Sequence, residues 1–209
     1  MRFSHPEPAV WLDTGARIVT PSPLIAHAME RQYAELQLAR GVKTWPQSPA
    51  LSLSAWLQQM WRDARYRFGE ELPLLLSPTQ EQYLWIQAIG KSGFDVLNVP
   101  ATARAAMAAA GFVSDWQLPL DHPSWESTDD TAQFRHWLAS IDARCREERW
   151  VSSTRLLSVI GSYLRCLSLE PHIILAGFTE LPTALRLLVE ALKSSGITVE
   201  EVSMAAAHP

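Results

Sequence analysis

Short apolar stretches that alternate with helical patterns constrain most strongly how this chain can fold. Proline, glycine or serine ends each stretch, as in Thr20-Pro21-Ser22-Pro23. The four stretches cover residues 16–20, 50–53, 172–175 and 197–202. Strands that alternate with helices favour a parallel sheet with helices on both faces. The sequence therefore predicts an α/β fold with about four strands.

The chain between the second and third strands reads as helical. Ser77-Pro78-Thr79-Gln80 has the spacing of a capping box with proline in the first turn, and the alanine-rich residues 100–113 also fit a helix. We expect residues 1–15 to be an N-terminal extension and residues 16–209 to form one α/β domain with a helical insertion at about 70–168. We also expect the chain to be an N-terminal fragment of a longer protein.

Composition excludes several classes of protein. The longest apolar runs fall far short of the ~18 residues of a membrane span, and the N-terminus lacks the apolar core of a signal peptide. We therefore expect a cytoplasmic protein without a membrane partner. Cys145 and Cys166 lack metal-ligand spacing, so we expect two reduced, inert thiols and no metal site.

The sequence lacks the motifs that bind ATP. No G-x-x-x-x-G-K-[ST] run is present, and the Gly-Lys-Ser at Lys91 reads as the end of a helix. The strand at residues 172–175 runs into Ala176 and Gly177, where a P-loop ATPase would place the acidic residues that hold Mg²⁺. We therefore expect no cofactor, and we interpret Ala176 and Gly177 as a degenerate Walker B position.

The charge pattern limits how the chain can meet nucleic acid. The net charge is −4, although 15 of the 18 basic residues are arginine, the side chain best suited to phosphate. Any contact with DNA must therefore be local. The nine tryptophans lie mostly at helical spacing, which favours core or interface positions over base stacking.

The order of these segments resembles the N-terminal helicase-like domain of AddB-type proteins, the second subunit of AddAB recombination helicase-nucleases, and a related group of bacterial DNA repair nucleases. Five segments carry the resemblance across nearly the whole chain. They are RIVTPSPLIAHAMERQYAELQ, PALSLSAWLQQMW, LLLSPTQEQYLWIQAI, FRHWLASIDARCREERW and HIILAGFTELPTALRLLVEAL. Two departures stand out: residues 1–15 contain no P-loop strand, and Ala176 occupies a position where AddB-type chains often have Asp.

The resemblance implies a P-loop-NTPase-like, RecA-like domain of the superfamily 1 helicase type with degenerate Walker motifs. It implies an ATP-incompetent module that handles DNA or serves as a scaffold in DNA repair and recombination. The expected partners are DNA, bound weakly as a single strand or duplex end, and a helicase motor subunit. In this family a C-terminal PD-(D/E)xK domain cuts DNA, so residues 1–209 would not be an enzyme.

Two alternatives stay open on the sequence. The chain could be a protein-interaction module that docks on a motor subunit without touching DNA. It could also be an unrecognised α/β enzyme that uses the edge where the strands end. A salt-dependent DNA-binding measurement separates DNA handling from the interaction module.

The candidate DNA contacts follow the first two strands. Thr20 and Ser22 follow the first strand, and Ser52 and Trp56 follow the second. In helicase-like domains the equivalent loops touch the DNA backbone. Simple capping by Ser22, and a core position for Trp56, are the competing interpretations. Glu180 reads as a residue in the first turn of the next helix, where its charge would suit the helix dipole.

Overall fold

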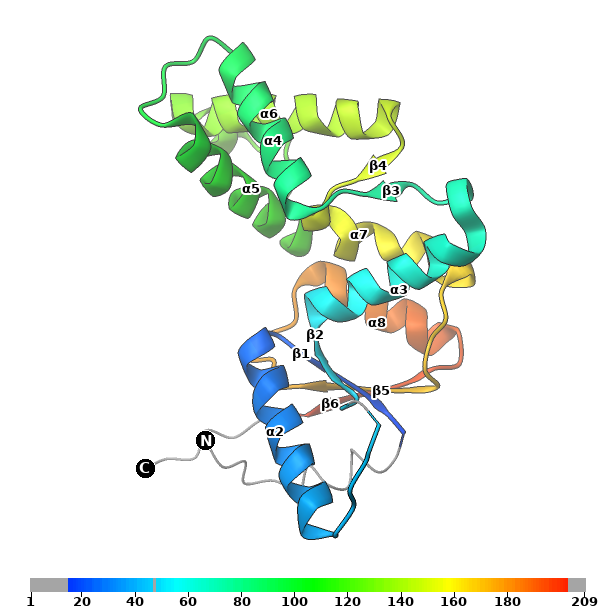
Figure 1. Ribbon diagram of the computed structural model, residues 1–209. Coiled ribbons are helices and arrows are strands. Elements are labelled where there is room, and N and C mark those ends of the chain that lie inside the picture. The colour runs from blue at the N-terminus through cyan, green and yellow to red at the C-terminus, as the bar shows by residue number, and fades with distance from the viewer. Residues whose placement is uncertain (1–14, 47, 203–209) are drawn as a thin grey trace. The chain divides into compact units, whose positions relative to one another are not determined.

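A four-stranded parallel sheet forms one compact part of the protein (Figure 1). The structure is a computed structural model that describes residues 15–46 and 48–202. The strand order is β2-β1-β5-β6, so β1 lies between β2 and β5. The strands are β1 (Arg17–Thr20), β2 (Ala50–Ser52), β5 (His172–Ala176) and β6 (Thr198–Val202). The predicted α/β class with a parallel sheet is confirmed.

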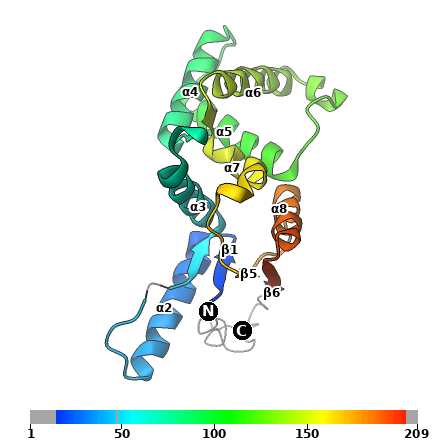
Figure 2. The same cartoon turned by 90° about the vertical axis from the view of Figure 1, so that its right-hand side faces the viewer.

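Helix α2 (Pro23–Ala39) covers one face of this sheet (Figure 2). Met29 and Tyr33 of α2 pack against Ile18, Ala50 and Ile174. These three residues lie opposite one another in the register of three neighbouring strands and therefore point to the same face of the sheet. The intervening residues Val19, Ile173 and Leu175 are also buried and point to the opposite face. Burial on both faces explains why these strands read as continuous apolar runs.

The chain divides into two compact units. The first comprises residues 1–63, 167–181 and 189–209 and contains the sheet; the second comprises residues 64–166 and 182–188. Helices α3 (Leu53–Phe68) and α8 (Thr183–Ser194) contribute residues to both units.

The second unit is mainly helical. Its longest helices are α4 (Pro78–Lys91), α5 (Val99–Trp116) and α6 (Asp129–Glu147), and a short α7 (Leu156–Ile160) follows. The short 3-10 helices are η1 (Gly69–Glu71), η2 (Pro123–Glu126), η3 (Ser153–Arg155) and η4 (Gly161–Cys166). The core of this unit is built from one face of each long helix, with Trp85 stacked on Phe134 at 6.0 Å between ring centroids.

The local sequence signals in this unit correspond closely to its helix ends. Ser77 and Gln80 form the predicted capping box, with both reciprocal hydrogen bonds present. The Gly-Lys-Ser at Lys91 is the C-terminus of α4, as predicted. Cys145 is buried on α6, and burial together with the nearby Asp142 raises the pKa of its thiol to about 11. Cys166 is a free, half-buried thiol.

The structure differs from the expectations drawn from the sequence in three places. A second sheet, β3 (Leu74–Leu75) paired in parallel with β4 (Trp150–Val151), was not predicted. Helix α5 continues to Trp116, beyond the alanine-rich residues 100–113 that were expected to be helical. Glu180 lies in a bend before α8, not in its first turn, because Pro182 disfavours a helical conformation at Leu181.

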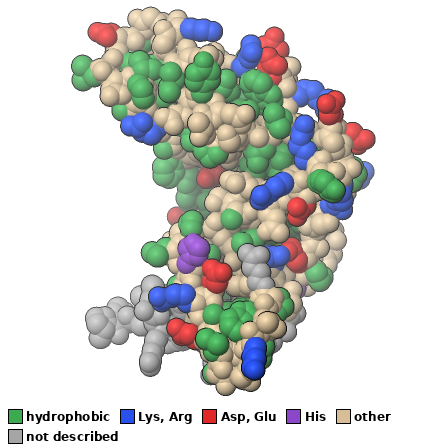
Figure 3. Space-filling view, in the orientation of Figure 1, with side chains coloured by type: hydrophobic (Ala, Val, Ile, Leu, Met, Phe, Trp, Pro, Cys, Tyr) green, Lys and Arg blue, Asp and Glu red, His purple; other side chains and the backbone are tan. Residues whose placement is uncertain are grey.

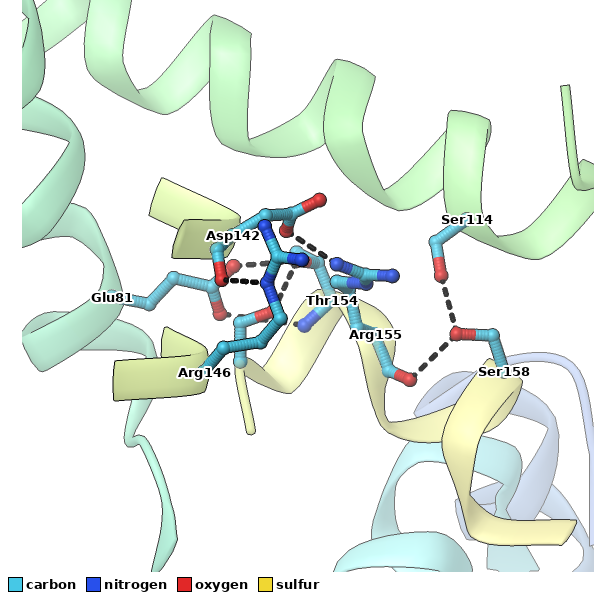
Figure 4. A network of polar contacts seen from close by, with 8 residues as sticks. Glu81, Ser114, Asp142, Arg146, Thr154, Arg155 and Ser158 are labelled. Atoms are coloured by element: carbon cyan, nitrogen blue, oxygen red, sulfur yellow. Dashed lines mark hydrogen bonds and ion pairs between the residues drawn. The ribbon is translucent and has the colours of Figure 1, made fainter. Parts of the chain in front are cut away.

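A buried carboxylate ties the helices of the second unit to the β3–β4 pair (Figure 4). Glu81 of α4 is 1% exposed, and its carboxylate accepts hydrogen bonds from the Ser153 backbone at 2.7 Å and the Ser153 hydroxyl at 2.6 Å. It also accepts from the backbone and hydroxyl of Thr154. Nearby, Arg155 pairs with Asp142 of α6. Glu81 thus holds the segment that follows β4 against the start of α4.

None of the described helices is long and apolar enough to cross a membrane.

We predict that Glu81→Ala lowers the free energy of unfolding by about 3 kcal/mol, because four donors lose a buried acceptor. Urea denaturation followed by circular dichroism measures the change. Glu147→Ala, on the exposed side of α6, is the control and should change stability by less than about 0.5 kcal/mol. A loss for Glu81→Ala no larger than that of the control would contradict the anchoring role of Glu81.

Asp115 gives the helical unit a specific pH dependence. Burial raises the pKa of this half-buried α5 carboxyl from 3.8 to about 6. The folded state therefore binds the Asp115 proton more tightly than the unfolded state does. Stability falls as the pH rises from 3.8 through about 6, because the folded state must then release this proton. We expect Asp115→Asn to raise stability by about 1 kcal/mol at pH 7.5 but not at pH 4. Urea denaturation at both pH values tests this, and a destabilised Asp115→Asn protein at pH 7.5 would contradict it.

Candidate nucleic-acid interface

The candidate residues meet at the carboxyl edge of the four-stranded sheet. From β1 the chain adds β2 on one side and β5 and β6 on the other. Open parallel sheets bind ligands at the point where the strand order reverses, outside the carboxyl ends of the strands. In this sheet that point lies between the ends of β1 and β5, at Thr20 and Ala176. Ser52 stands directly beside Thr20 in the β1–β2 register.

The Thr20 and Ser22 side chains shape the turn that joins β1 to α2. Thr20 is fully buried, and its hydroxyl donates to the carbonyl of Ser22 at 3.0 Å or of Leu51 at 3.3 Å. Ser22 has an extended backbone, and its hydroxyl accepts from the N–H of Ile25 at 3.4 Å. With Pro23 in the first turn, this is a serine-capped helix start. The capping interpretation of Ser22 is confirmed.

The second loop repeats this design at the start of α3. The Ser52 hydroxyl accepts from the N–H of Ala55 at 3.3 Å and lies 3.3 Å from the hydroxyl of Ser54. Ser52 is buried, whereas Ser54 is exposed. Two serine-capped helix N-termini therefore lie at the ends of adjacent strands.

Trp56 belongs to the core. Its side chain is 2% exposed, so no face of the indole is open for a base to stack on. The core interpretation of Trp56 is confirmed, and its expected role in stacking has no support in the arrangement of the ring.

The end of β5, which was expected to be a degenerate Walker B position, carries no acid at its last residue or at the one that follows. Ala176 is the last residue of β5 and is fully buried. Gly177 has a φ of +82°, and its N–H donates to the carbonyl of Val202 at 3.1 Å. That bond continues the pairing of β5 with β6 past the end of the strand. Backbone contacts thus close this strand end, and neither Ala176 nor Gly177 has a side-chain oxygen that could bind Mg²⁺.

The segments at the carboxyl edge of the sheet carry little charge. Among residues 20–26, 52–56 and 176–181, Glu180 is the only charged residue. The first N–H groups of a helix have no acceptor within it, and here they include those of the exposed Leu24 and Ser54. Backbone donors and the positive ends of two helix dipoles can contact an anion such as phosphate. Within residues 15–46 and 48–202, no group of three or more His, Cys, Asp or Glu residues could hold a metal ion.

The structure brings the loops after β1 and β2 together, but it buries most of the side chains that were expected to contact DNA. Three of the four expected contacts, Thr20, Ser52 and Trp56, are buried. The exposed polar residues of the same edge segments are Ser54, Thr179 and Glu180. The signal for Ser54 is its position two residues after the capping Ser52, on the open side of the first turn of α3.

No protein-family model matches this sequence, and no curated protein matches it. Membership of the AddB-like family therefore stays a prediction drawn from the order of the segments. Function has to be argued from the geometry of the edge together with that resemblance.

We predict that the chain does not bind Mg-ATP. The segments 20–26, 52–56 and 176–181 contain no lysine for the phosphates, and the end of β5 carries no acid at Ala176 or Gly177 to hold Mg²⁺. Isothermal titration calorimetry should give only the heat of dilution, matching a titration of MgCl₂ alone. A micromolar dissociation constant for Mg-ATP would contradict this reading of Ala176 and Gly177.

Proposed function

We propose that this chain is an ATP-incompetent, helicase-like DNA-handling domain of a bacterial, cytoplasmic DNA repair protein. The observation that carries the proposal is the pair of serine-capped helix N-termini, α2 and α3, at the end of adjacent parallel strands. In this proposal they contact the phosphates of a single strand through backbone N–H groups. The Walker B position, Ala176-Gly177, supplies no catalytic acid, so binding is not coupled to hydrolysis.

The RecA-like ancestry is part of this proposal. It is supported by the order of the five resembling segments and by a parallel sheet whose strand order reverses at β1. Under this proposal residues 1–209 bind and position DNA but do not cut it, and a nuclease domain of the longer protein would do the cutting.

The chemistry of the edge sets the strength of the proposed contact. Its three segments contain no Lys or Arg, so phosphates meet N–H groups rather than side-chain cations. Phosphate contacts of this kind do not distinguish one base from another. We therefore expect weak binding without sequence preference.

The interaction-module alternative has its own supporting observation. The helical unit contains a groove with exposed aromatic and aliphatic side chains, away from the sheet edge in sequence and in a different compact unit. This function does not require DNA.

A single added charge tests the DNA contact without removing a cap. Ser54→Glu puts an acid in the first turn of α3, where the helix dipole stabilises it, but where it would repel a phosphate. We expect affinity for a labelled oligothymidylate at low salt to fall by about threefold to tenfold. The melting temperature should stay the same or rise slightly.

Gln59→Glu is the matched control. It adds the same charge to the same helix at an exposed position about 7.5 Å further along the axis. Affinity should change by less than about twofold, because the repulsion between two charges separated by water weakens as their distance grows. Equal losses in the two variants would place the contact elsewhere, and no binding by either the wild type or the longer protein would end the DNA-handling proposal.

A further inference from the structure

The helical unit contains an open groove of about 880 Å³ between α4 and α6. One wall is a single face of α4 that runs from Thr79 through Tyr83 and Gln87 to Lys91, at helical spacing. The other wall is the face of α6 around Ser140, Arg144 and Glu147. Three more side chains complete the lining: Leu74 of β3, Leu76, which follows β3, and Trp150 of β4. Figure 3 shows apolar side chains gathered on the face that carries these elements.

The groove displays the residue types on which protein interfaces depend. Tyr83 is 59% exposed and Leu74 is 40% exposed, although both lie beside a well-packed core. The guanidinium of Arg144 lies over the ring of Trp150, 5.9 Å from its centroid. Tyr, Trp and Arg are the residues most enriched where protein partners bind tightly. The groove therefore displays three such residues, of which Tyr83 and Arg144 are exposed and Trp150 is half-buried.

The shape of the groove fits a long occupant better than a small molecule. Small-molecule sites converge a few polar groups on one point. Here the uncharged polar groups are spread along α4 from Thr79 to Gln87. The whole wall, from Thr79 to Lys91, is about 18 Å long. A helix of about three turns has that length.

The charges of the groove are placed at its two ends. Helix α4 begins just after β3 and α6 ends just before β4, so Glu147 lies near the β3–β4 end and Lys91 near the opposite end. Lys91 makes no ion pair within the described part of the chain. Glu147 is 4.0 Å from Arg144, whose closer partner is Glu148 at 2.8 Å. An occupant is thus favoured if it carries an acid near Lys91 and a base near Glu147.

The same charges disfavour nucleic acid in the groove. Single-strand channels combine aromatic platforms with a positive path for the backbone. Here Glu147 and Glu148 surround Arg144, so phosphates would meet carboxylates beside one of the two available cations.

We infer that the α4–α6 groove docks an amphipathic helix of a partner protein. The apolar stripe of that helix lies on Leu74, Tyr83 and Trp150, and its ends carry an acid facing Lys91 and, about three turns away, a base facing Glu147. This docking is independent of the DNA contact at the sheet edge.

Selection from a phage-displayed library of helix-forming peptides of about 15 residues on the 209-residue chain tests this inference. We expect enriched peptides to share an apolar stripe with an acid at one end and a base at the other. Fluorescence anisotropy of synthesised peptides then measures affinity. Tyr83→Ala should weaken it by about tenfold or more. Tyr66→Ala, at a tyrosine that is 93% exposed on α3 and outside the groove, should change it by less than about twofold.

Exchanging the charges of Lys91 and of the peptide tests how the bound helix is oriented in the groove. Lys91→Glu should weaken peptide binding, and a peptide whose acid is exchanged for lysine should recover affinity for that variant, whereas Lys193→Glu on α8 should do nothing. The inference is overturned if no peptide is enriched, if binding survives Tyr83→Ala, or if charge exchange has no effect. It is equally overturned if an oligothymidylate binds the wild type and loses affinity on Tyr83→Ala, since nucleic acid would then occupy the groove.

Discussion

The pairing of β1 with a parallel strand on each side is the constraint on which the candidate interface depends. Because β2 and β5 both run parallel to β1, every connection must leave from the same edge of the sheet and return to the other. Two helices therefore begin side by side at that edge, after Thr20 and after Ser52. Each start needs a cap, and serine supplies it. The backbone donors that could meet phosphate are thus a consequence of the topology, not of any single reactive side chain.

A different interaction organises the helical unit. The carboxylate of Glu81 accepts from Ser153 and Thr154, 72 and 73 residues away along the chain, and so fixes the segment after β4 against the first turn of α4. That contact sets one end of the α4–α6 groove, where Trp150 and Leu74 come together. The sheet edge thus offers backbone donors to an anion, whereas the groove offers large apolar side chains to a protein helix. Under the two proposals, one chain would bind two different partners at two separate sites.

Much of the fold could be predicted because its signals are local. Ser22-Pro23 and Ser77 with Gln80 mark helix starts by chemistry within four residues, and apolar runs such as Ile173–Leu175 mark buried strands. The two-residue strands β3 and β4 could not be predicted, since their pairing joins Leu74 to Trp150 and leaves no periodicity to read. The groove was missed for the same reason. The sequence predicted where the loops after β1 and β2 lie, but it could not predict the burial of Thr20, Ser52 and Trp56, which depends on neighbours far along the chain.

The central claim is that single-stranded DNA lies on the carboxyl edge of the sheet through backbone N–H groups. An NMR titration of the ¹⁵N-labelled chain with unlabelled oligothymidylate observes those N–H groups directly. We predict that the largest changes in amide chemical shift fall at Leu24, Ser54 and their neighbours in the first turns of α2 and α3. The amide signals of α4 and α6 should not shift. Shift changes confined to the helical unit, or none at any DNA concentration, would contradict it.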